Sequence, residues 1–107
     1  MALRPIAPEE RALIEHLLKQ VTNGGKYRIP DEVEPYSGSG PGSILLARRG
    51  EHAGDLVEAE YRDKDRQPVL ITLSVNEFGE LYDLDLWRSD FDPLQQYPRP
   101  EDLFGAQ

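Results

Sequence analysis

The chain has 107 residues, contains no cysteine and carries a formal net charge of −8, so it is long enough for one modest core. Disulfides, thiolate nucleophiles and cysteine-based zinc sites are excluded, and an acidic chain repels nucleic acid and anionic lipid. No apolar run reaches the roughly 18 residues that a membrane helix needs, and glutamates occupy the segment in which a signal peptide would be apolar. We therefore expect a single cytoplasmic domain over residues 1–107 that binds neither nucleic acid nor membrane.

The first predicted element is an amphipathic helix over residues 8–22. Its apolar face consists of four residues at helical spacing: Ile14, Leu17, Leu18 and Val21. Pro8 suits the first helical position, and the Asn-Gly-Gly sequence at 23–25 favours a helix end. Residues 26–42 are predicted to form a loop, because prolines and a Ser/Gly-rich run break any periodicity. That run lacks the lysine and the following helix of a phosphate-binding loop, which indicates a connector.

The rest of the sequence predicts four strands and a tail. The expected strands are residues 43–49, 55–62, 68–76 and 80–88. The intervening turns are too short for crossover helices, which predicts hairpins and an antiparallel meander over residues 43–88. The expected fold is therefore α+β, with the N-terminal amphipathic helix packed on a four-stranded antiparallel β-meander. Residues 89–107 contain three prolines and are predicted to be an extended tail.

Pairing the apolar sets with each other fixes the register of the strands. Val57 is expected opposite Leu73, Leu73 opposite Leu84, and Val75 opposite Tyr82. On the other face this register creates three cross-strand rows: Glu58–Thr72–Asp85, Leu56–Ser74–Asp83 and Glu60–Leu70–Trp87.

The face that carries these rows has the character of a protein-binding surface. Tryptophan is a frequent interface anchor, and carboxylates steer a cationic partner. We therefore predict that a basic protein partner binds at six residues: Glu58, Glu60, Leu70, Asp83, Asp85 and Trp87. The tail contains enough aromatic and aliphatic residues to fold over this face instead, which leaves its exposure open.

Two other functions use the same predicted structure. One is a divalent-metal-dependent hydrolase with ligands from Glu58, Glu60, Asp83 and Asp85. However, the backbones of Glu58 and Asp85 are expected two strand spacings, roughly 9–10 Å, apart, and an open sheet face does not exclude water. We predict no catalytic residues, no metal site and no cofactor. The other is a homodimeric structural subunit, in which the edge strand 43–49 pairs with a second copy.

The segment LYDLDLWRSDFDPL (residues 81–94) resembles the signature of a family of small uncharacterised bacterial domains, Leu-x-x-Leu-Asp-x-Trp-Lys/Arg-x-Asp-Phe-x-Pro-Leu. The residues that meet it are Leu81, Leu84, Asp85, Trp87, Arg88, Asp90, Phe91, Pro93 and Leu94. An Asp-x-Asp-Gly turn is also typical of that family, and here Asp63-Lys-Asp-Arg66 lacks the glycine. Within the signature, Asp90 and Asp92 are predicted to close the turn after the last strand, with Arg88 as an ion-pair partner.

The resemblance implies no activity. In size, acidity and lack of a catalytic set, the chain also resembles, by type only, the immunity proteins of bacterial toxin systems, which are cytoplasmic inhibitors. The expected function is therefore a non-enzymatic acidic binding domain, and more specifically an immunity-type inhibitor of a basic bacterial toxin domain.

Overall fold

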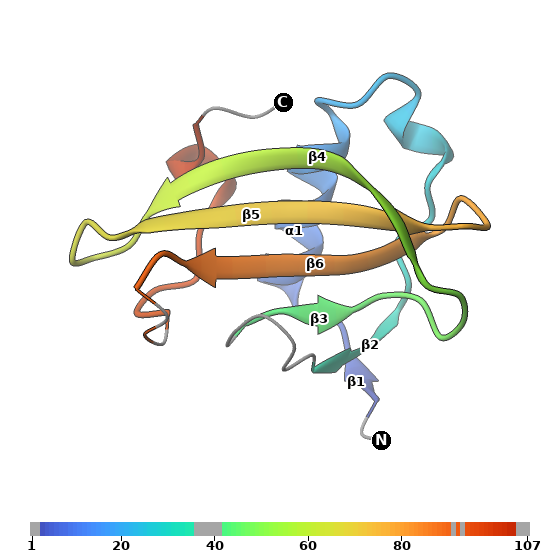
Figure 1. Ribbon diagram of the computed structural model, residues 1–107, viewed down its shortest axis with the longest axis horizontal. Helices are drawn as coiled ribbons and strands as arrows, with labels where there is room; N and C mark the ends of the chain where they lie inside the picture. The colour runs from blue at the N-terminus through green and yellow to red at the C-terminus, as the bar shows by residue number, and fades with distance from the viewer. Residues whose placement is uncertain (1–2, 36–41, 91, 93, 105–107) are drawn as a thin grey trace.

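The computed structural model describes residues 3–35, 42–90, 92 and 94–104. In this part of the chain, one six-stranded antiparallel sheet lies in front of the helix α1 (Pro8–Leu18), an α+β arrangement (Figure 1). The strands are β1 (Arg4–Pro5), β2 (Glu32–Pro35), β3 (Ile44–Leu45), β4 (His52–Arg62), β5 (Pro68–Asn76) and β6 (Leu81–Arg88). Two short 3-10 helices, η1 (Gly24–Lys26) and η2 (Pro100–Asp102), complete the fold. Among the described residues, no helix is both long and apolar enough to cross a membrane.

The predicted four-stranded meander with an N-terminal helix packed on it is wrong, because the sheet has six strands in the order β1-β2-β3-β6-β5-β4. β3 was expected to form a hairpin with β4, but Ile44 pairs with Leu84 of β6 instead. The chain then passes the β5–β6 turn and begins β4 at the far edge. Asn76 stabilises this connection between β3 and β4, because its Nδ2 donates a hydrogen bond to the carbonyl oxygen of Arg49 (3.1 Å). The Glu77 carboxylate accepts a hydrogen bond from the backbone N–H of Glu51 (2.7 Å).

The predicted loop 26–42 contains a strand that the sequence pattern did not indicate. β2 pairs with both β1 and β3, and the side chain of Val33 is buried. The sequence Glu-Val-Glu-Pro has one aliphatic residue and no alternation, so its pairing depends on neighbours that are distant in sequence. Residues 36–41 of that loop lie outside the described part of the chain.

The helix α1 ends at Leu18, four residues before the predicted end. After Leu18 the backbone makes successive turns with bonds between residues three apart, such as Gly24 N–H to the Val21 carbonyl (3.0 Å). A side chain at Gly24 would place its Cβ 2.0 Å from the Leu18 carbonyl oxygen. The glycine therefore lets the chain fold back directly against the end of the helix.

The predicted register of the three long strands is largely confirmed. Leu73 pairs with Val57 on one side and Leu84 on the other. Three register irregularities change the ends of the ladder, two in β4 and one between β5 and β6. As a result, Val75 pairs with Leu81 rather than Tyr82, and Asp55 rather than Leu56 pairs with Ser74. Apolar side chains of α1 and of the three strands share one core, with members Leu13, Ile14, Leu17, Leu18, Val57, Ala59, Tyr61, Val69, Ile71, Leu73, Leu84 and Leu86.

The described part of the C-terminal segment lies on the same side of the sheet as α1. Leu94, Tyr97 and Leu103 pack against the core, and η2 is seen behind the sheet (Figure 1). Phe104 then reaches the edge of the sheet, where its backbone N–H donates to the carbonyl oxygen of Glu60 (3.0 Å) and its carbonyl accepts from the Glu60 N–H (2.8 Å). This segment therefore leaves the opposite face of the sheet open.

Candidate functional site

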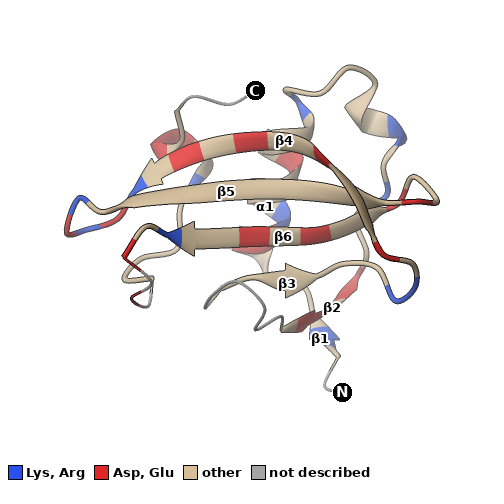
Figure 2. Cartoon of the chain, viewed as in Figure 1, with Lys and Arg blue, Asp and Glu red and all other residues tan. Residues whose placement is uncertain are grey.

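The face of the sheet that is turned away from α1, here called the outer face, carries the predicted binding residues. The β4–β5–β6 register creates three rows on it: Glu60–Leu70–Trp87, Glu58–Thr72–Asp85 and Asp55–Ser74–Asp83. The first two rows are as predicted, and in the third Asp55 takes the place of Leu56. Figure 2 shows acidic bands on β4 and β6, on either side of β5, which carries no charged residue.

The predicted binding residues differ in exposure. Glu60 is exposed, and Trp87 retains 42% of its accessible surface. Glu58, Leu70 and Asp85 are half-buried. Asp83, in contrast, is only 7% exposed. Five of these six residues are therefore accessible on the surface, whereas Asp83 is not.

The beginning of β4 crosses in front of β5 and β6 (Figure 1), and the register places Asp83 in one row with Ser74 and with Asp55 near the start of β4. The hydroxyl of Ser74 donates to the Asp83 carboxylate within the buried part of the sheet. Burial is the largest effect on Asp83 and raises its pKa, and the negative charges of Asp85 and Asp55 act in the same direction. The Ser74 hydrogen bond and the nearby His52 only partly offset this rise.

Asp85 is positioned by β3. Ser43, which directly precedes β3, donates its hydroxyl to Asp85 Oδ1 (2.8 Å) and accepts the backbone N–H of Leu86 (2.9 Å). The insertion of β3 beside β6 therefore fixes the orientation of this carboxylate. Sequence analysis could not assign this role to Ser43, because it placed β3 beside β4.

Many acids of the chain have a basic partner, and on the outer face itself His52 Nε2 lies 2.9 Å from Asp55 Oδ1. Arginines pair with acidic residues elsewhere: Arg4 with Glu10, Arg11 with Asp31, Arg48 with Glu32, Arg49 with Glu80, and Arg99 with Asp102. Among the described residues, no lysine or arginine forms an ion pair with Glu58, Glu60, Asp83 or Asp85. Arg62 follows Glu60 on β4, but its guanidinium donates to the Arg66 carbonyl (3.5 Å). Within the described part of the chain, the negative charge of these four carboxylates is therefore not compensated by a lysine or an arginine.

A second acidic group surrounds Arg88, whose side chain is 2% exposed. Its guanidinium donates to Asp63 (2.9 Å), Asp65 (2.8 Å) and Asp90 (2.5 Å). Hydrogen bonds to this guanidinium lower the pKa of Asp90 to about 2. Asp90 Oδ1 also accepts the backbone N–H of Asp92 (3.1 Å), so its predicted role in closing the turn after the last strand is confirmed.

Asp63 joins the β4–β5 turn to the C-terminal segment. Its buried carboxylate accepts the backbone N–H groups of Gln95 (2.8 Å) and Gln96 (3.0 Å) as well as the Arg88 guanidinium. Burial acts to raise the pKa of Asp63, but these hydrogen bonds outweigh it and the pKa is lowered. The sequence pattern did not indicate this role of Asp63. The available signal was that Arg88 alternates with Leu84 and Leu86, because an arginine on the buried face needs carboxylate partners.

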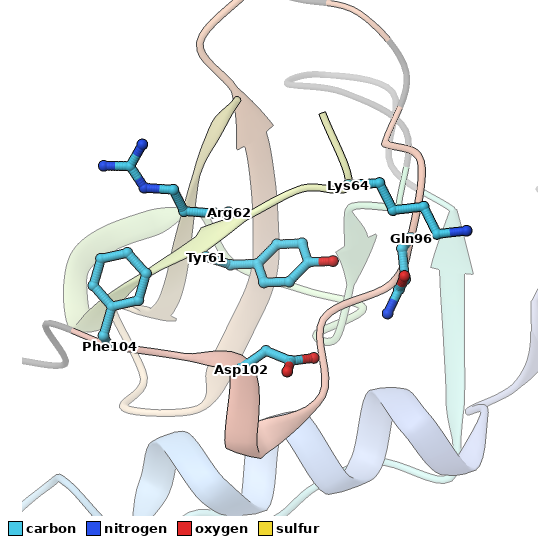
Figure 3. A pocket seen from close by; sticks show the side chains of 6 residues that line it. All are labelled: Tyr61, Arg62, Lys64, Gln96, Asp102 and Phe104. Atoms are coloured by element: carbon cyan, nitrogen blue, oxygen red, sulfur yellow. The ribbon is translucent and has the colours of Figure 1, made fainter. Parts of the chain in front are cut away.

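A hollow of 220 Å³ lies at the end of β4 (Figure 3). Tyr61, Lys64, Gln96, Asp102 and Phe104 contribute to its walls, and the Tyr61 hydroxyl points away from Phe104. Arg99 pairs with Asp102 at 3.0 Å. Within the described part of the chain, no group of three or more His, Asp or Glu side chains is placed to hold a metal ion.

The comparison with known families gives one result. The sequence profile of a family described as Domain of unknown function (DUF6984) matches residues 3–98. The chain belongs to this family. The DUF6984 match contains α1, all six strands and both acidic groups, so membership in a small uncharacterised domain family is confirmed. The signature itself, the bacterial origin and the likeness to immunity proteins stay predictions, and Phe91 and Pro93 of the signature lie outside the described residues. No curated protein and no solved structure matches this DUF6984 chain significantly.

Proposed function

We propose that this DUF6984 domain is a non-enzymatic binding domain whose outer face receives a basic protein segment. The observation that carries the proposal is the set of four carboxylates, Glu58, Glu60, Asp83 and Asp85, which lack a cationic partner among the described residues. They flank the uncharged strand β5, and Trp87 lies at one end of the same surface. A cationic segment that lies along β5 would contact carboxylates on both sides.

The physical advantage of this arrangement lies in both association rate and specificity. A field of one sign on one face accelerates the encounter with an oppositely charged partner and repels anionic competitors. Trp87 and Leu70 are neighbours in one row and supply apolar contact area beside the charges. The more specific form of the proposal is an immunity-type role, in which the domain covers a cationic surface of a toxin domain and thereby blocks it. The chain's net charge of −8 supports this form.

The experiment uses a decalysine peptide as the probe. Trp87 is the only tryptophan in the chain, so its fluorescence reports binding at the outer face. Replacing two outer-face acids, Glu58→Gln with Glu60→Gln, is expected to weaken binding roughly three- to tenfold at low salt, since an exposed charge pair contributes about 0.2–1 kcal/mol.

The matched control is the double variant Glu9→Gln with Glu15→Gln. Both residues are exposed on α1, behind the sheet, and the change in net charge is the same. Equal weakening in both double variants would show that the peptide responds to net charge alone, and the proposal would then fail. Binding of a decaglutamate peptide with similar affinity would contradict it as well.

The hydrolase alternative uses the same acids and is separated by calorimetric titration with Mg²⁺, Mn²⁺ and Ca²⁺. Micromolar binding that Asp85→Ala abolishes would favour the hydrolase over the binding domain.

The homodimer alternative depended on residues 43–49 being an edge strand. In the structure β3 lies between β2 and β6, so that argument no longer supports a dimer.

A further inference from the structure

A second hollow, of 340 Å³, opens beside the acidic rows. Its lining is largely apolar and includes Leu3, Leu45, Ala47 and Tyr82. Leu3 is 41% exposed and Tyr82 is half-buried, so apolar surface is accessible within the hollow. Pockets that bind a side chain or a small ligand have this mostly apolar character.

The register places this hollow on the outer face. Leu45 of β3 pairs with Asp83 of β6, and directly paired residues of an antiparallel sheet point to the same side. Glu34 of β2 pairs with Leu45 in turn. The row that begins with Asp55 and Ser74 therefore continues through Asp83 and Leu45 to Glu34, across five strands, and the hollow lies at its far end.

The charges around the hollow leave it open to a cationic partner. Two arginines line it, but Arg48 pairs with Glu32 (2.8 Å) and Arg49 pairs with Glu80 (3.0 Å). The Arg49 guanidinium also lies 4.3 Å from the centre of the Phe78 ring. Both cations are thus already compensated. Glu34, on the rim, forms no ion pair with any described residue, so the rim adds negative charge to that of the neighbouring rows.

We propose that this hollow receives one large apolar side chain of the basic segment that binds the outer face. The inference rests on the proposed function and adds a requirement on the partner, namely an aromatic or large aliphatic residue next to its lysines or arginines. The two observations that support this occupant are the continuity of the hollow with the acidic rows and the compensated charge of its two arginines. An anchor side chain that enters a pocket surrounded by polar contacts is typical of the residues that dominate interface energies.

The test compares, by calorimetry, two oligolysine peptides that are identical except for the central residue, which is phenylalanine in one and glycine in the other. The phenylalanine peptide is expected to bind the wild-type protein about tenfold more tightly, which is the effect of burying one large apolar side chain. Ala47→Phe fills the hollow from within and is expected to abolish this advantage, while the affinity for the glycine peptide stays unchanged. Phe104→Ala, which removes an exposed apolar side chain at the other hollow, serves as the control and is expected to keep the advantage.

NMR of the wild-type protein gives a readout that does not depend on any variant. The phenylalanine peptide is expected to shift the methyl signals of Leu45 and Ala47 more than the glycine peptide does. Equal affinity of the two peptides, an advantage that survives in Ala47→Phe, or peptide-specific shifts at Leu70 instead would overturn the inference. Those results leave the proposed function in place. If instead neither peptide distinguishes the Glu58/Glu60 double variant from the Glu9/Glu15 double variant, the proposed function itself fails.

Discussion

Two groups of aspartates lie on opposite faces of β6. On the buried side, Arg88 gathers three carboxylates, and Asp63 among them has a fully buried side chain. On the outer face, the carboxylates of Asp83 and Asp85 accept hydrogen bonds from the serine hydroxyls of Ser74 and Ser43. The alternation of one strand therefore separates acids that pair with a buried arginine from acids that form no ion pair with a described lysine or arginine.

The largest expected effect is on the buried side. Asp63→Ala should lower the free energy of unfolding by about 3–5 kcal/mol, because it removes one partner of a buried ion pair and the acceptor of three backbone N–H groups, those of Lys64, Gln95 and Gln96. Urea denaturation followed by circular dichroism measures this. Asp65, whose side chain is 36% exposed, is the matched control. A loss in Asp65→Ala as large as that in Asp63→Ala would contradict the central role of Asp63.

Ser74→Ala tests how Asp83 is kept buried on the outer face. The variant removes the hydroxyl that donates to the Asp83 carboxylate, and we expect a loss of about 2 kcal/mol at pH 7, as for a hydrogen bond to a charged group. The same substitution in an Asp83→Asn background should cost less, because no buried charge then depends on the hydroxyl. Equal losses in the two backgrounds would show that Ser74 stabilises the sheet independently of Asp83.

Asp83→Asn should stabilise the protein at pH 7. The pKa of Asp83 is raised above its ordinary value of 3.8, so the folded state binds its proton more tightly than the unfolded state does. Wild-type stability contributed by this group is therefore present below pH 3.8 and is lost as the pH rises through the raised pKa. The asparagine variant lacks this loss, and its advantage in thermal unfolding should disappear in acid. An advantage that is constant from pH 3 to pH 7 would exclude this explanation.

The smallest effect is expected for the double variant Glu58→Gln with Glu60→Gln. Because neither carboxylate forms an ion pair within the described residues, the free energy of unfolding should change by less than about 0.5 kcal/mol. Urea denaturation of this variant beside Asp63→Ala sharpens the comparison between the two faces. A loss above about 1 kcal/mol would show that these two acids also contribute to folding.

Sequence alone was sufficient for the parts of the fold that rest on local pairing. Leu73 and Leu84 belong to strands joined by a short turn, and Gly79 in that turn adopts a positive φ of 78°. Ile44 belongs to a two-residue strand whose partner, Leu84, is distant in the chain. A strand that short has no alternation to read, so neither its neighbours nor its place inside the sheet could be predicted.

In the candidate site, too, the features that rest on local alternation were predictable and those that rest on distant contacts were not. Alternation along β6 placed Asp83, Asp85 and Trp87 on one face, and the structure keeps them there. The burial of Asp83 was not predicted. Nor was the irregularity of β4 that brings Asp55 into its row in place of Leu56, because no pattern of residue types reveals such a shift. The pairing of Arg88 with Asp90 was predicted and is confirmed, but Asp63 and Asp65 were missed because they come from a turn that carries no periodic signal.

The position of β3 has a consequence for how the chain reaches its native state. β4, β5 and β6 are joined by short turns, whereas the contact between β3 and β6 closes a loop of about 40 residues, which is entropically costly and slow to form. We therefore infer that the three long strands assemble early and that the N-terminal third docks onto them afterwards. Amide protons of β2 and β3 should then exchange with solvent through a partial opening that leaves those of β5 protected.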